Sequence, residues 1–130
     1  DLAFKINNKR IEYSKDKFPI QALALDIGHK TIDNYIKEIK KAKVIFWKGT
    51  AGNCSINYFC YGTNKLLKAM EKSKAFCIVS GGHSETAIEK FKINKKKLGY
   101  VSLSGGALVH YIAGKNMPGL SILKIKNLTR

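Results

Sequence analysis

The chain has 130 residues, a length that fits one domain built around one core. Its hydrophobic content of 45% excludes a disordered chain, and no apolar run is long enough to span a bilayer. The first residues, Asp1 to Lys5, lack the basic and apolar segments of a secretory signal, so we expect a cytoplasmic protein without a membrane partner.

The chain is strongly basic. It contains 24 Lys and Arg residues but only nine Asp and Glu residues, which gives a formal charge of +15. This charge fits a nucleic-acid binder, a protein that attracts a small polyanion such as a nucleotide, or one part of a larger protein with acids elsewhere. Lys far outnumbers Arg, although Arg usually leads in base and phosphate recognition. We therefore rank nucleic-acid binding third and expect no specific nucleic-acid partner.

The cysteines are odd in number and lack the spacing of metal ligands. Cys54, Cys60 and Cys77 are therefore predicted to be free thiols in a reducing compartment, and no protein metal site is predicted.

The N-terminal part predicts a small β-hairpin, followed by a short apolar run and a helix. The predicted elements are strands at 2–6 and 10–13, a short apolar run at 21–26 and a helix at 32–41. Asn7 and Asn8 tolerate positive φ, which suits a tight turn between the first two strands. Thr31 is a candidate N-cap for the helix.

The rest of the chain alternates between apolar strand-like runs and amphipathic helix-like runs. The predicted strands are 44–47, 76–79 and 100–103, and the predicted helices are 61–71, 85–91 and 107–113. This alternation predicts an α/β protein with a three-layer, Rossmann-like parallel sheet and helices on both faces. With the N-terminal hairpin, residues 1–130 form one predicted domain.

Glycine-rich loops follow all three strands, at 48–53, 80–84 and 104–107. Two of them share a Ser-Gly-Gly turn, at residues 80–82 and 104–106. Glycine lets the backbone approach a ligand closely, and a first helical turn presents free N–H groups. A single glycine can simply close a turn, but three such loops at one sheet edge predict an anion site, most plausibly for phosphate. P-loop and dinucleotide fingerprints are both absent from the sequence.

Several motifs together resemble the C-terminal, nucleotide-binding domain of phosphoglycerate kinases. In collinear order they are Leu25-Asp26-Ile27-Gly28, residues 44–52, Tyr61-Gly62-Thr63, Gly81-Gly82-His83-Ser84, residues 104–108 and residues 113–120. The match covers nearly the whole chain. His83 stands where many members carry Asp, which is similar to the archaeal-type branch.

The resemblance implies part of an enzyme that transfers phosphate between 1,3-bisphosphoglycerate and ADP in glycolysis. It implies ATP or ADP as cofactor, with Mg²⁺ carried by the nucleotide. The family's N-terminal, phosphoglycerate-binding domain has no counterpart in this sequence, so we expect it in the same or a companion chain. The chain alone is expected to be inactive, as a fragment, half of a split enzyme or a truncated copy.

The resemblance also implies the site residues. The catalytic positions are Gly81, Gly82, Gly105 and Gly106. The nucleotide-binding positions are Lys48, Gly49, Thr50, Gly52, Ser55, Ser80, His83, Ser84 and Ser104. Lys48 adds a cation toward the phosphates or faces solvent. Ser55 aligns near the family's ribose-binding Glu but cannot accept two hydroxyl hydrogen bonds as a carboxylate can.

Two expectations concern other partners. The departures from the family's pattern, such as Ser55 near the position of the ribose-binding Glu, leave an alternative function. This alternative is a degenerate, non-catalytic nucleotide- or partner-binding domain. At the C-terminal end, residues 120–130 alternate between apolar and polar side chains, and the apolar ones need a partner to cover them. We expect this tail to be poorly ordered or to mediate self-association with a neighbouring copy.

Overall fold

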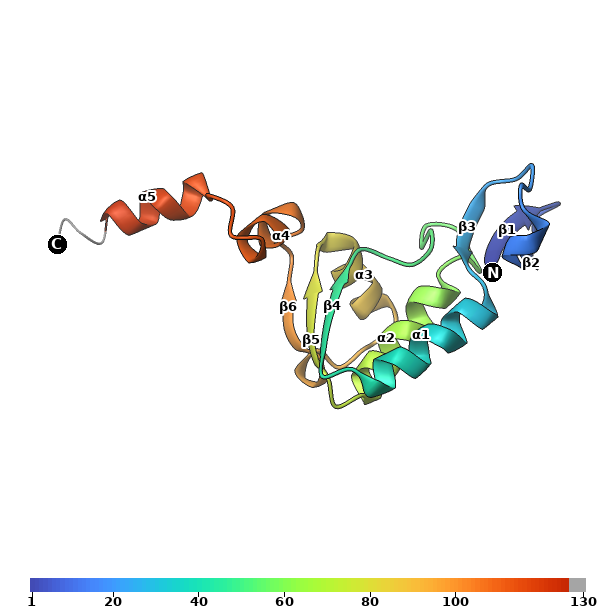
Figure 1. The fold of residues 1–130 in the computed structure, drawn as a ribbon, viewed down its shortest axis with the longest axis horizontal. Helices are drawn as coiled ribbons and strands as arrows, with labels where there is room; N and C mark the ends of the chain where they lie inside the picture. The colour runs from blue at the N-terminus through green and yellow to red at the C-terminus, as the bar shows by residue number, and fades with distance from the viewer. Residues whose placement is uncertain (127–130) are drawn as a thin grey trace.

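The structure, a computed structural model, describes residues 1–126. Its N-terminal strands are β1 (Leu2–Ile6), β2 (Lys9–Tyr13) and β3 (Ala24–Ile27), and they form an antiparallel sheet in the order β2-β1-β3. The predicted hairpin is confirmed, and its turn holds Asn7 and Asn8 at φ values of 48° and 60°. The apolar run before Gly28 joins this sheet as β3, beside β1 (Figure 1).

Helix α1 (His29–Lys41) begins earlier than the sequence predicts. Gly28 is its N-cap residue, and Thr31 lies in the first turn. The carboxylate of Asp1 accepts hydrogen bonds from the backbone N–H of Thr31 at 2.8 Å and of Lys30 at 3.2 Å. The predicted capping role of Thr31 is therefore wrong, because a side chain 30 residues away satisfies the first turn.

The second sheet is parallel and carries the candidate site. Its strands are β4 (Val44–Lys48), β5 (Phe76–Ser80) and β6 (Gly99–Ser102), in the order β4-β5-β6. The register pairs Lys48 with Ser80 and Ser80 with Ser102, so the three strands end side by side. The predicted α/β class and parallel sheet are confirmed.

Helices α1, α2 (Tyr61–Lys72) and α3 (Gly82–Lys90) build the core with one face of this sheet. Figure 1 shows α1 and α2 lying side by side. The fully buried core side chains include Leu66, Leu67, Met70, Cys77, Val79 and Leu98. Strand side chains alternate between faces, so one side of each strand reaches this core.

The other face of the parallel sheet is apolar and exposed. Val44 is 63% exposed, Phe46 45%, Phe76 53% and Tyr100 51%. We call these four residues the open sheet face. The second helical layer predicted from the β-α alternation is therefore not seen over these side chains within residues 1–126. The sequence pattern could not reveal this, because exposed and buried apolar strand residues look alike.

Helices α4 (Gly106–Ile112) and α5 (Pro118–Lys126) follow the last strand. No α4 residue is buried, and Figure 1 shows α5 extending away from both sheets. Leu120, Ile122 and Leu123 of α5 are 41–60% exposed. Residues 127–130 of the predicted tail lie outside the described residues, and its self-association stays a prediction. Among residues 1–126, no helix is both long and apolar enough to cross a membrane.

The cysteine prediction needs correction. Cys54 and Cys60 form a disulfide, with their Cα atoms 4.3 Å apart, whereas Cys77 is free and buried. Burial raises the pKa of the Cys77 thiol. The chain between β4 and α2 folds back on itself and brings Cys54 and Cys60 together, a proximity that their spacing of six residues does not reveal.

Candidate functional site

Three glycine-containing loops meet at the carboxyl ends of β4, β5 and β6. They enclose a cavity of about 430 Å³, which we call the loop pocket. Its lining residues are Lys48, Gly49, Gly81, Gly82, His83, Leu103, Gly105 and Gly106. All four predicted catalytic glycines therefore lie around one cavity, together with Lys48, Gly49 and His83. The parallel register produces this convergence, because it aligns the carboxyl ends of the three strands.

Buried serine hydroxyls connect the loops. Ser84, fully buried, accepts a hydrogen bond from the N–H of Gly49 at 2.9 Å, and its hydroxyl lies 2.8 Å from the carbonyl oxygen of Ser80. The hydroxyl of Ser80, also fully buried, donates to the carbonyl oxygen of Ser104 at 2.5 Å. Ser80 and Ser84 thus lie behind the loop pocket and do not line it.

Lys48 brings a positive charge to the loop pocket. It is the last residue of β4, and its Cε lies 3.9 Å from the position that a Cβ on Gly105 would occupy. The same position on Gly105 lies 3.9 Å from the Cα of Gly81, so the two Ser-Gly-Gly turns touch. Among the described residues that line this pocket, none is acidic. The pocket therefore favours an anionic ligand.

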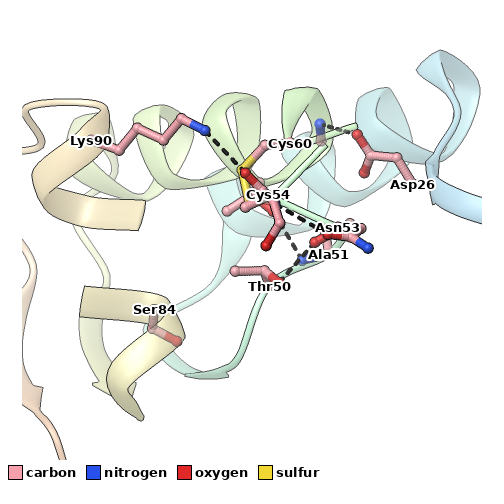
Figure 2. Close-up of a disulfide and its surroundings, with 12 residues drawn as sticks. Asp26, Thr50, Ala51, Asn53, Cys54, Cys60, Ser84 and Lys90 are labelled. Atoms are coloured by element: carbon pink, nitrogen blue, oxygen red, sulfur yellow. Dashed lines mark hydrogen bonds between the residues drawn. A yellow bond between two sulfur atoms is a disulfide. The ribbon is translucent and has the colours of Figure 1, made fainter. Parts of the chain in front are cut away.

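A second cavity of about 350 Å³ adjoins the first through His83. We call it the side pocket, and its lining residues are Thr50, Asn53, Cys54, Ser55, His83, Thr86, Ala87 and Lys90. Figure 2 shows Lys90 reaching from α3 toward the loop that holds Cys54, where its Nζ donates to the Cys54 carbonyl at 3.1 Å. Thr50 and Ser55, both predicted nucleotide-binding residues, lie here.

Four further residues line the side pocket without having been predicted from the sequence, namely Asn53, Cys54, Thr86 and Lys90. A signal was available for the two on α3. His83, Thr86 and Lys90 recur at helical spacing and therefore share one face of α3. Asn53 and Cys54 carry no such signal, because an irregular loop places them.

Besides Ser80 and Ser84, two more predicted residues, Gly52 and Ser104, line neither pocket. A Cβ added to Gly52 would collide with the Asp26 carboxylate and the Phe59 carbonyl, so Gly52 permits close packing. Ser104 is exposed, and its N–H donates to the Ser102 hydroxyl at 3.1 Å. Its predicted contact with nucleotide stays a prediction.

Asp26 binds the start of α2 and packs against Gly52 in the loop after β4. Its buried carboxylate accepts from the N–H of Gly62 at 3.0 Å and from Arg10 at 3.3 Å. Burial raises the pKa of Asp26, against the opposing effect of these donors. Figure 2 shows Asp26 bound to the start of α2, apart from Ser84 and Lys90. We therefore assign Asp26 a structural role.

No group of three or more His, Cys, Asp and Glu side chains suited to a metal ion occurs within residues 1–126. Of the described residues that line the loop and side pockets, none is a carboxylate. The two pockets thus offer backbone N–H groups, hydroxyls, an imidazole and two ammonium groups.

The family model for phosphoglycerate kinase matches residues 1–115. The phosphoglycerate kinase of Leptospira biflexa is 42% identical over 101 residues, 78% of this chain and 25% of that protein. The Methanothermus fervidus enzyme is 37% identical over 124 residues, 95% of this chain and 30% of that protein.

Solved structures agree with the sequence relatives. The phosphoglycerate kinase from Pyrococcus horikoshii superposes with a TM-score of 0.87 and 29% identity, over 99% of this chain and 32% of that one. The Coxiella burnetii enzyme gives a TM-score of 0.81 and 31% identity, over 94% of this chain and 32% of that one. The chain thus spans about a quarter to a third of these relatives. The chain belongs to the phosphoglycerate kinase family.

Proposed function

We propose that this chain is the nucleotide-binding, C-terminal part of a phosphoglycerate kinase, and that it binds the phosphates of ADP or ATP. The observation that carries this proposal is the meeting of three glycine loops and Lys48 around one pocket without a carboxylate among its described lining residues. Phosphoryl transfer depends mainly on positioning and on neutralising charge, which backbone N–H groups and a lysine can supply.

The two adjoining pockets suggest which part of the nucleotide each would bind. The phosphates would lie in the loop pocket, and the nucleoside would extend past His83 into the side pocket. Ser55 offers the ribose one hydroxyl in place of a carboxylate, so we expect phosphate recognition to be stronger than ribose recognition. His83 also supports our assignment to the archaeal-type branch.

Magnesium would come with the nucleotide. Mg²⁺ prefers oxygen ligands, chiefly carboxylates, phosphates and water. The described residues around the two pockets supply no carboxylate, so the protein groups present do not by themselves form a magnesium site. We therefore assign no residue of this chain as a metal ligand.

The open sheet face supports the proposal of a missing partner. Four large apolar side chains stand exposed on one face of the sheet that carries the site. We propose that further phosphoglycerate kinase sequence, in the same or a companion chain, covers this face and supplies the phosphoglycerate-binding domain. Without it, the 130 residues are expected to be inactive.

ADP titration followed by amide NMR tests the nucleotide proposal. ADP should bind weakly, with the largest shifts at Gly81, Gly82, Gly105 and Gly106. Lys48→Met should raise the Kd by roughly twofold to fivefold, as expected for a partly exposed ion pair. Lys97→Met, a lysine outside both pockets, is the matched control. Shifts confined to other basic surfaces would overturn the proposal.

A degenerate, non-catalytic domain is the second candidate, favoured by Ser55 at the ribose position. Adding a purified N-terminal phosphoglycerate kinase domain separates the two candidates. ADP-dependent phosphoryl transfer in the mixture would support a split or fragmented enzyme, whereas ADP binding without turnover would support the degenerate domain.

Duplex DNA should bind only weakly and lose affinity steeply with added salt, whereas tight, sequence-selective binding would favour a nucleic-acid function.

A further inference from the structure

The turn between β6 and α4 has little support from the core. Within the described residues, α4 contributes no buried side chain. What holds the turn beside its neighbour is the pairing of β5 with β6, which ends at Ser80 and Ser102, and a hydrogen bond from the Gly81 N–H to the Ser102 carbonyl at 2.9 Å. Beyond these backbone contacts, one buried side chain reaches the turn.

That side chain is Ser80, which is fully buried at the end of β5. Its hydroxyl donates to the carbonyl oxygen of Ser104 at 2.5 Å, across a separation of 24 residues. Because the bond ends on a backbone carbonyl, it constrains an entire peptide plane and not only a side chain. The peptide in question joins Ser104 to Gly105.

The geometry of that peptide determines where its N–H points. A trans peptide is planar and holds its C=O and N–H in opposite directions, and the only cis peptide among the described residues precedes Pro19. Because the Ser104 carbonyl is turned toward buried Ser80, the Gly105 N–H points away from Ser80, and Gly105 itself lines the loop pocket. Within residues 1–126 this N–H makes no hydrogen bond.

We propose that Ser80 is a positioning residue that turns the Ser104–Gly105 peptide so that the Gly105 N–H donates to a phosphate oxygen in the loop pocket. The inference rests on the proposed function for its ligand, but not for the orientation of the peptide. Glycine at this position can turn either way, because it lacks a Cβ. Without the Ser80 hydroxyl, the peptide would sample orientations that present its carbonyl to the anion.

The test compares Ser80→Ala, Ser80→Thr and the control Ser73→Ala. Ser73 matches Ser80 because its hydroxyl also donates to a carbonyl, that of Met70 at 2.8 Å, but it lies at the C-terminal end of α2. ¹⁵N relaxation without ligand measures the order of the Gly105 and Gly106 amides. Titration with ADP, and separately with inorganic phosphate, measures the Kd.

Ser80→Ala should lower the amide order parameters at Gly105 and Gly106, and it should raise the Kd for ADP and for inorganic phosphate by about fivefold to tenfold. Ser80→Thr keeps the hydroxyl and should restore both values. Ser73→Ala should change neither. A general loss of stability would instead affect amides throughout the sheet.

The two proposals fail in different ways. If the unsubstituted chain binds neither ADP nor phosphate, the nucleotide function fails, while the relaxation data still judge Ser80. If Gly105 and Gly106 keep their order in Ser80→Ala, the role of Ser80 is overturned, even where ADP binds. If Ser80→Ala does not fold, Ser80→Thr decides: native order and Kd support the role of the hydroxyl, and changed values overturn it.

Discussion

Among single residues, Arg10 organises a polar cluster where the N-terminal sheet meets the start of α1. Its guanidinium donates to Glu12 at 2.7 Å, to Asp26 at 3.3 Å and to the Ile27 carbonyl at 2.9 Å. Glu12 in turn accepts from the backbone N–H of His29 at 2.8 Å. The cluster links the hairpin to the start of α1, and Arg10 also donates to the carbonyl of Tyr58 in the loop after β4 at 3.4 Å.

The ionisation of Glu12 should make stability depend on pH. Burial acts to raise the pKa of Glu12, but hydrogen bonds from His29 and Arg10 outweigh it, so the pKa lies below its ordinary value of 4.5. A lowered folded-state pKa contributes stability that is present above the ordinary value and lost as pH falls through the folded-state value.

We therefore expect Glu12→Gln to reduce the free energy of unfolding at pH 7. The difference in free energy of unfolding between Glu12→Gln and the unsubstituted chain should become smaller below about pH 4. Urea unfolding at several pH values measures this difference. Glu38→Gln is the control, because Glu38 is 72% exposed and pairs only with Lys41. A constant gap between Glu12→Gln and the unsubstituted chain at all pH values would contradict the linkage.

At the scale of elements, the entry into β6 shows how a local backbone requirement enforces sheet pairing. Gly99 has φ +109°, and a Cβ there would lie 2.9 Å from the ring of Phe76. Only glycine adopts this conformation without strain. Because Gly99 has no side chain, the ring of Phe76 can lie over it, and β6 can begin beside β5.

Gly99→Ala should lower the free energy of unfolding by about 1–3 kcal/mol, from backbone strain and from the collision with Phe76. Gly119→Ala is the matched control, because Gly119 lies in α5 with open space around its Cβ position. It should leave global unfolding unchanged. Equal effects of the two substitutions in urea unfolding would refute the role assigned to Gly99.

At the level of the whole molecule, two apolar surfaces are exposed among the described residues. One is the open sheet face, and the other lies on α5, where Leu120, Ile122 and Leu123 are exposed. Burying each large apolar side chain is worth about 1.5–3 kcal/mol, so either surface can drive association.

Deleting residues 120–130 distinguishes the two surfaces. If the tail mediates self-association, sedimentation velocity should show a shift from oligomer toward monomer after the deletion. Phe46→Ser on the open sheet face is the comparison and should leave that oligomer intact. An oligomer that survives the deletion but dissociates with Phe46→Ser would contradict the predicted role of the tail.

Several features of the fold depend on short-range patterns and could be predicted from the sequence. Short apolar runs predicted the strands of the parallel sheet, and Asn7 and Asn8 predicted the hairpin turn. The Ser-Gly-Gly turns predicted where the loops would converge. These succeed because strand period, turn conformation and parallel register are set by neighbouring residues and by the β-α order. The family resemblance rested on the same local motifs.

Other features depend on residues that lie far apart in the sequence, and only the folded chain reveals them. Asp1 caps α1 from 30 residues away, and Cys54 meets Cys60 through the folding of an irregular loop. The exposure of Phe46 depends on which elements cover its face. Ser80 looked like a ligand-facing residue in sequence, but it lies buried behind the pocket and bonds to Ser104. Such contacts join residues across the fold, so no local pattern encodes them.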